Sequence, residues 1–356
     1  VSTDPGDSGL PVSDGGTSVN FTHSEGYWAT TSANGFNYDN FDISLQAEGM
    51  NSFYFNGLTR VVRRLNDASP WAVDGSHVAP VSTLISRSGL TTALSSTADF
   101  AVASTAEPRV WYSYLSGNWS EPNNWTLDGA VSPQFLNPGN ETPSEPDSVV
   151  INSGRTITSD LNGIRVNRLE ILGTLNLAAT GDHDFNYILG NGTMRLSGNA
   201  GADNYPSGED SLFYDAGEGG TVEYFGSGVT ISEIRRFNDL SINLDNASDE
   251  VTHTADSIYV FGDMTITQGV FQFGDDTTPQ NVVASVDRTL LVEPNGGIQV
   301  GSTNSRHEFN LSGDFTNQGT SLFTNRVTRN ETSEATDGIV DVNFVSDTQD
   351  QNVNLQ

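Results

Sequence analysis

The chain has 356 residues, no cysteine and a formal net charge of −30, which comes from 45 acidic residues against 15 arginines and no lysine. The missing cysteine excludes disulfides and thiolate metal sites, and the negative charge argues against nucleic acid and anionic membranes as partners. With 35% hydrophobic and 17% charged residues and 36 glycines, the composition favours turns and short strands over a compact enzyme, and no apolar run predicts a transmembrane segment.

Residues 1–107 are predicted to form a β-sandwich module of the immunoglobulin-like kind. Short strands separated by turn signals recur at a spacing of roughly ten residues, which is typical of such a sandwich. The expected strands are Phe41–Gln46, Asn51–Phe55, Thr59–Leu65, Trp71–Val73 and Asp99–Ala103. Arg60, Arg63 and Arg64 form a basic cluster within this module. We interpret the cluster as one strand face paired with nearby aspartates, and a ligand site is the alternative.

Residues 108–147 are predicted to be a proline-rich entry segment that caps the following domain. All five tryptophans fall within the first 125 residues, and five of the 13 prolines lie between Pro122 and Pro146. This change in composition predicts a domain boundary near residue 107.

Residues 148–356 are predicted to form a parallel β-helix, or β-solenoid, of short strands without intervening helices. Apolar residues recur at period two between Gly, Asn and Asp turns. The phase shifts by one residue between Val166 and Leu169, and we predict a corner between two faces there. The expected inward-facing groups are Ile164/Val166, Leu169/Ile171, Leu175/Leu177, Met194/Leu196, Leu240/Ile242/Leu244, Ile258/Val260, Met264/Ile266, Ile298/Val300, Phe309/Leu311 and Val340/Val342/Phe344.

A family resemblance begins at the segment Gly117-Asn-Trp-Ser-Glu-Pro-Asn-Asn-Trp125, and further motifs follow in order: Asp147-Ser-Val-Val-Ile151, Gly154-Arg-Thr-Ile-Thr158 and Leu169-Glu-Ile-Leu-Gly-Thr-Leu-Asn-Leu177. This series resembles the opening of a solenoid domain in large repetitive cell-surface adhesins of Bacteroidetes-type bacteria. The resemblance covers about 110–350. It implies export by the type IX secretion system and a place on the outer cell surface.

Candidate catalytic and metal-binding groups are dispersed along the sequence. The five histidines show no metal-binding spacing, and no nucleophile elbow, phosphate loop or dinucleotide motif occurs. Asp182-His183-Asp184 is interpreted as a solvated turn rather than a transition-metal site. Arg235 and Arg236 with Asp239 could suit a polysaccharide lyase, although exposed arginines at a strand edge are the favoured interpretation.

No cofactor is expected from the sequence, and structural calcium is the alternative. The acidic turns Asp245–Asp249 and Asp275-Asp276 offer clustered oxygen ligands, and the four candidate ligands are Asp245, Asp249, Asp275 and Asp276. The acidity also suggests a halophilic or marine source, or the ordinary acidity of an exported protein. Ser148, Ser211, Ser257 and Thr277 each follow an Asp and precede an apolar residue or Thr, a pattern that resembles O-glycosylation sites of Bacteroidetes surface proteins, although chance occurrence is the favoured interpretation.

Two functions remain open. The favoured hypothesis is a non-enzymatic, extracellular structural or adhesive segment, such as a stalk, adhesin or filament subunit. It would contact other copies of itself, further domains of a longer chain or surface glycans. Its assembly edge is predicted at Ile339, Val340, Val342 and Phe344. The alternative is a β-helix protein that binds or cleaves polysaccharide.

Overall fold

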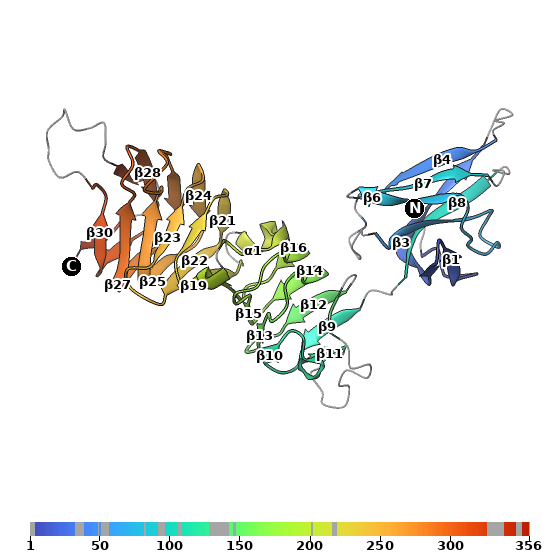
Figure 1. Cartoon of the computed structure of the whole chain (residues 1–356), viewed down its shortest axis with the longest axis horizontal. Helices are drawn as coiled ribbons and strands as arrows, with labels where there is room; N and C mark the ends of the chain where they lie inside the picture. Colours follow the sequence, from blue (N-terminus) through green and yellow to red (C-terminus); the bar gives the residue numbers. More distant parts are fainter. Residues whose placement is uncertain are drawn as a thin grey trace. The chain divides into compact units, whose positions relative to one another are not determined.

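The computed structural model describes residues 4–32, 39–48, 50, 57–81, 83–91, 97–105, 109–127, 142–144, 147–200, 202–215, 219–325, 338–346 and 351–355. These residues form an all-β protein, in which α1 (Ser211–Tyr214) is a single short α-helix. The chain divides into two compact units, residues 1–110 with 144–148 and residues 111–143 with 149–356 (Figure 1). No helix within the described ranges has the length and apolar character needed to cross a membrane.

The first unit contains two three-stranded antiparallel sheets and a hairpin. One sheet has the order β3 (Phe21–Thr31), β8 (Thr97–Ser104), β5 (Arg60–Arg64), and the other has the order β4 (Phe41–Gln46), β7 (Leu84–Leu90), β6 (Ser76–Val81). The hairpin joins β1 (Val12–Asp14) to β2 (Thr17–Val19).

The sheet β3-β8-β5 is covered on both faces. Val61 and Phe100 join a core cluster with Leu45 and Ile85 of the other sheet. The neighbouring Val62 belongs to a second cluster that contains Trp71. All five residues of β5 are therefore buried, its three arginines included.

Most of the strands predicted for this unit are present. Phe41–Gln46 is strand β4, and the strands expected at 59–65 and 99–103 correspond to β5 and β8. The expected strand at 71–73 is wrong, because this segment makes only an isolated bridge between Ala72 and Arg63. The strand expected at 51–55 lies outside the described residues.

The second unit is built from one long sheet and two shorter sheets. The long sheet has the order β10 (Gly117–Asn118), β13 (Thr156–Thr158), β15 (Thr174–Asn176), β17 (Thr193–Ser197), β19 (Thr221–Gly226), β22 (Asp239–Leu244), β25 (Met264–Phe273), β27 (Leu290–Val300), β29 (Phe315–Asn317), β32 (Val353–Leu355), as Figure 1 shows in part. Three further strands join this sheet off that path: β23 (Glu250–His253) pairs with β25 and with β20 (Val229–Ile231), and β30 (Thr320–Leu322) pairs with β27.

The two shorter sheets follow each other along the chain. The early short sheet has the order β11 (Trp125–Thr126), β9 (Val110–Ser113), β12 (Ser148–Ile151), β14 (Arg165–Ile171), β16 (Asp184–Leu189), β18 (Ser207–Glu209). The late short sheet has the order β21 (Arg235–Phe237), β24 (Ser257–Val260), β26 (Val283–Val286), β28 (Arg306–Leu311), β31 (Ile339–Phe344). Helix α1 lies in the chain where one gives way to the other, and its Phe213 is part of the core.

Parallel pairing lines up the core side chains of the long sheet in one column. The register places eight apolar residues directly beside one another from strand to strand: Ile157, Leu175, Met194, Val222, Leu240, Met264, Leu290 and Phe315. All eight are buried in a single hydrophobic cluster. Because side chains alternate between the two faces of a strand, this column keeps the same side of every strand facing the core.

The period-two pattern correctly predicted the core. Every residue of the predicted inward-facing groups belongs to this cluster except Val342, which is partly buried, and Phe344, which is 46% exposed. The predicted corner between Val166 and Leu169 is wrong, because β14 runs through both residues within one sheet. The phase shifts at the buried Asn167, whose side chain accepts a hydrogen bond from Asn186 Nδ2 of the next strand at 3.2 Å.

Candidate assembly edge and other candidate sites

Strand β31 carries the predicted assembly edge. Its pairing partner is β28, in a parallel register that runs from Arg306↔Ile339 to Leu311↔Phe344. Among the described strands, no other strand pairs along its far side, apart from a bridge of Ile339 to Thr324. The backbone from Val342 onward is therefore an open edge of the described sheet.

The four predicted edge residues differ in exposure. Val340 is 5% exposed and lies in the core, whereas Val342 and Ile339 are half-buried. Phe344 and the following Val345 are each 46% exposed. Nearby in the long sheet, β32 pairs with β29 and leaves Leu355 65% exposed. Exposed apolar side chains thus accompany open backbone groups, a combination that favours strand addition.

The opposite end of the second unit is closed by the tryptophan segment on which the family resemblance rests. Trp119 and Trp125 are buried, with ring centroids 5.0 Å apart, and Trp125 Nε1 donates to Trp119 O at 2.8 Å. A Cβ atom at Gly117 would lie 2.5 Å from Asn124 Nδ2, so a larger residue here would displace the Asn124 side chain, which donates to Asn118 O. The spacing of these residues is explained by packing at the end of the sheets.

The arginine cluster of the first unit is internally paired. Arg60 Nε lies 3.1 Å from Asp14 Oδ2, and Arg63 Nη1 lies 3.6 Å from Asp74 Oδ2. Arg87, which the sequence did not single out, donates two 2.8 Å hydrogen bonds to Asp14. The Arg87 hydrogen bonds, followed by the charges of Arg87 and Arg60, outweigh burial and lower the pKa of Asp14.

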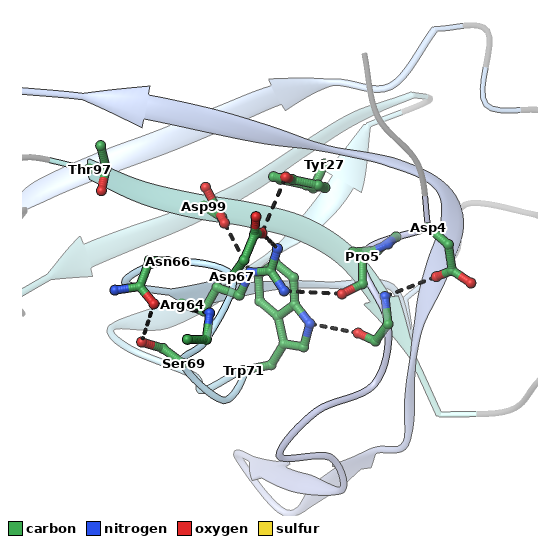
Figure 2. Close-up of polar contacts among 12 residues, drawn as sticks. Asp4, Pro5, Tyr27, Arg64, Asn66, Asp67, Ser69, Trp71, Thr97 and Asp99 are labelled. Carbon is green, nitrogen blue, oxygen red and sulfur yellow. Dashed lines mark hydrogen bonds and ion pairs between the residues drawn. The ribbon is translucent and has the colours of Figure 1, made fainter.

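The Arg64 guanidinium is enclosed by polar and aromatic partners (Figure 2). It donates from Nε to Asp99 Oδ2 at 2.9 Å and from Nη1 to Pro5 O at 3.1 Å. Its guanidinium also lies 4.4 Å from the Trp71 ring centroid and 5.0 Å from that of Tyr27. The geometry therefore agrees with the interpretation of a strand face paired with aspartates, and the carboxylates occupy the positions that an anionic ligand would need.

The candidate calcium ligands hold turns in place. Asp249 Oδ2 accepts from the N and Nδ2 atoms of Asn246, and Asp276 Oδ1 accepts from Ser302 N at 2.7 Å. Asp275 Oδ1 accepts from the backbone N–H groups of Thr278 and Thr277, which lower the pKa of Asp275. No group of three or more His, Asp or Glu within the described residues could hold a metal ion. The Asp245 side chain makes no hydrogen bond or ion pair with the described residues, and a calcium role for all four stays a prediction.

The four candidate glycosylation residues differ in accessibility. Thr277 is exposed, and Ser148 and Ser211 are half-buried. Ser257 is 8% exposed within β24, so the folded chain does not present its hydroxyl for modification.

Two other candidate sites remain: the segment Asp182-His183-Asp184, and the combination of Arg235, Arg236 and Asp239. In each, the side chains make separate contacts. Asp184 pairs with Arg165 at 2.7 Å, while Asp182 is exposed with a φ of 59°. Arg236 lies over the Tyr259 ring, and Asp239 Oδ1 accepts from Asp263 N at 2.8 Å. The proposed lyase combination of Arg235, Arg236 and Asp239 is therefore divided among separate contacts.

Arg235 belongs to a buried polar network that no sequence signal revealed. It lies 3.0 Å from Asp203 Oδ2, and Asp203 Oδ1 accepts from the Tyr224 hydroxyl at 3.2 Å. Burial would lower the pKa of Arg235, but the Asp203 carboxylate outweighs it and the pKa is raised. Burial raises the pKa of Tyr205 and Tyr224, so both hydroxyls remain donors, and Tyr205 donates to Asp210 at 2.6 Å.

Three comparisons with known proteins complete the description of these sites. A scan against family models, a search of curated proteins and a search of solved structures found no match to this chain.

Proposed function

We propose that this chain is a structural, adhesive segment of an extracellular protein, in which a β-sandwich module precedes a parallel β-helix. The observation that carries the proposal is the column of in-register apolar residues from Ile157 to Phe315. In such a stack each strand contacts its neighbours on either side, so the fold extends in one direction by repetition. Repetition of this kind suits a stalk, an adhesin or a filament subunit.

The two ends of the stack support a directional assembly. The tryptophan segment closes the end near Gly117, whereas β31 and β32 each have one paired side among the described strands. An open parallel edge can accept another strand, either from a second copy or from a further domain of a longer chain. We propose that the edge at Val342 and Phe344 makes this contact.

The location on a bacterial cell surface rests on the sequence. The ordered motifs from Gly117 to Leu177 resemble large surface adhesins, and the net charge of −30 favours solubility in high salt. We propose further copies of the chain or surface glycans, rather than nucleic acid, as its partners. Structural calcium is part of the proposal as a stabilising ion.

The assembly proposal is tested by Phe344→Asp. We expect the natural chain to form oligomers in sedimentation velocity as concentration rises, and particles joined at their ends in electron micrographs. The added charge should oppose apolar contact at the edge and shift the chain toward single particles. Val81→Asp is the matched control, because Val81 is 72% exposed in the first unit.

The same material should be assayed on a panel of polysaccharides for cleavage. We expect no turnover, in keeping with a structural role. Isolated particles at every concentration together with measurable glycan cleavage would contradict the proposal and favour the enzymatic alternative.

A further inference from the structure

A polar cavity of about 690 Å³ lies at one corner of the second unit. It is lined by residues from three successive passes of the chain beside the early short sheet, among them Asn162, Arg165, Asp182, Asn204, Tyr205 and Ser207. Its size falls within the range of roughly 300–1,000 Å³ that is usual for small-molecule sites. Nothing in the proposed structural role requires such a cavity.

Hydrogen bonds between the passes fix the cavity wall. Gly163 N donates to Gly181 O at 2.9 Å, and Gly181 N donates to Asn162 Oδ1 at 2.9 Å. Asn204 is 8% exposed, and its Nδ2 donates to Ala178 O at 3.1 Å and Thr180 O at 2.9 Å. The wall is therefore held in shape before any ligand arrives, which reduces the entropic cost of binding.

Asp182 is the exceptional residue of this wall. Its φ of 59° places a non-glycine residue in the left-handed region, and its side chain is exposed at the cavity. The carboxylate makes no hydrogen bond or ion pair with any residue that the structure describes. Residues held in sparsely populated backbone regions cluster at binding sites.

The charges around the cavity limit the class of ligand. Arg165 is paired with Asp184, and Asp203 is paired with Arg235, so Asp182 is left as the uncompensated charge. A net negative wall disfavours phosphates and other anions. Hydroxyl donors suit the Asp182 carboxylate, and amide, hydroxyl and guanidinium groups lie beside it.

Tyr205 adds an apolar surface to this polar wall. Its ring is supported by Arg235, whose guanidinium lies 4.5 Å from the ring centroid, and by the edge of Phe237 at 6.2 Å. Tyr205 is partly buried against the hydrophobic core, and the part of it that lines the cavity lies among fixed carboxylate, amide and hydroxyl groups, a mixture that matches the polar edge and the apolar face of a sugar ring.

We propose that this cavity binds a neutral saccharide, with Asp182 as the principal hydrogen-bond acceptor and Tyr205 as part of the apolar wall. The site would add glycan recognition to the structural role. It does not depend on the open edge at Phe344, so the two proposals can fail separately.

The proposal is tested by calorimetric titration of the full chain with four neutral tetrasaccharides: cellotetraose, laminaritetraose, maltotetraose and xylotetraose. We expect at least one to bind. Asp182→Gly should weaken binding at least ~10-fold, the loss expected for hydrogen bonds to a charged group. Glycine is favoured at this positive φ, so the variant should fold. Arg165→Gln, at a half-exposed position, is a second variant and should also weaken binding.

Glu293→Gln is the matched control, because Glu293 lies on β27, outside the residues that line the cavity. It should bind the same tetrasaccharide as tightly as the natural chain does. Titrations with an alginate tetrasaccharide and with calcium alone separate a neutral sugar from an anion or a cation. The proposal is overturned if no neutral tetrasaccharide binds at millimolar concentration, if only alginate or calcium binds, or if Asp182→Gly and Arg165→Gln leave affinity unchanged.

Discussion

The two units place their charges in opposite ways. In the first unit Arg60, Arg63, Arg64 and Arg87 are each 6% exposed or less, and their carboxylate partners include the buried Asp14 and Asp99. In the second unit most ion pairs lie on the outside, as with Arg306–Asp341 and Arg288–Asp263, whose arginines are 73% and 62% exposed. Arg235 with Asp203 is a more buried exception.

The difference follows from how each unit builds its core. The sheet β3-β8-β5 is covered on both faces, so polar side chains of β5 have no solvated side and must find partners inside. In the long sheet, one face of each strand carries the column of buried apolar side chains. The charged residues of these strands project from the other face. Buried polar groups of the second unit are mainly neutral, and His183, His253 and His307 are among them.

Acidification should have the largest effect on stability, and it should act on both units, because burial also lowers the pKa of His23 in the first unit to about 3. Burial lowers the pKa of His183, His253 and His307 to about 4. An unfolded histidine titrates near ~6.5, so between these two values the unfolded chain binds more protons. The contribution of these histidines to the free energy of unfolding is therefore fully present above the unfolded-state pKa. It is lost as the pH falls toward the folded-state pKa. Each histidine should contribute roughly 1–3 kcal/mol to this loss.

Urea unfolding of the full chain at neutral pH and at a pH near ~5 measures this effect. Limited proteolysis identifies the unit that opens first. His307→Gln removes one of these buried histidines and should reduce the pH dependence by the contribution of one histidine. Equal stability at both pH values would show that the interior histidines are not held neutral.

Breaking a buried ion pair should have the next largest effect, confined to the first unit. Asp14→Ala leaves Arg87 and Arg60 without the carboxylate that both contact. Removing one partner of a buried pair costs about 3–5 kcal/mol, because the other charge stays buried. Chemical denaturation of the variant gives the change in the free energy of unfolding.

The matched control for Asp14→Ala is Asp341→Ala in the second unit. Asp341 pairs with Arg306, whose side chain is 73% exposed, and exposed pairs contribute about 0–1 kcal/mol. Similar losses in the two variants would contradict the contrast between buried and exposed charges.

Salt and calcium should have the smallest effect. With 45 acidic residues against 15 arginines, self-repulsion destabilises the folded chain, and ions screen it. The melting temperature should therefore rise by a few degrees from low salt with chelator to high salt with calcium. Sodium chloride and calcium chloride at matched ionic strength separate screening from specific binding. Identical midpoints in all conditions would count against both a halophilic character and structural calcium.

The sequence by itself determined the class of fold and the core of the second unit. Alternation of apolar and polar residues is a local property, since neighbouring side chains on a strand point to opposite faces. The pairs such as Leu240/Ile242 and Met264/Ile266 could therefore be assigned to the core before their partners were known. The glycine, asparagine and aspartate turns likewise marked where strands end.

Only the tertiary structure decided which distant residues meet. Asp14 contacts Arg87, Arg235 contacts Asp203, and the cavity at Asp182 combines three passes of the chain. The tertiary structure also showed that β14 continues through the phase shift without a corner. The shift occurs at Asn167, which accepts a hydrogen bond from Asn186 of the next strand. These outcomes depend on the path of the chain between strands. That path is set by the packing of whole sheets, which no local pattern of residues encodes.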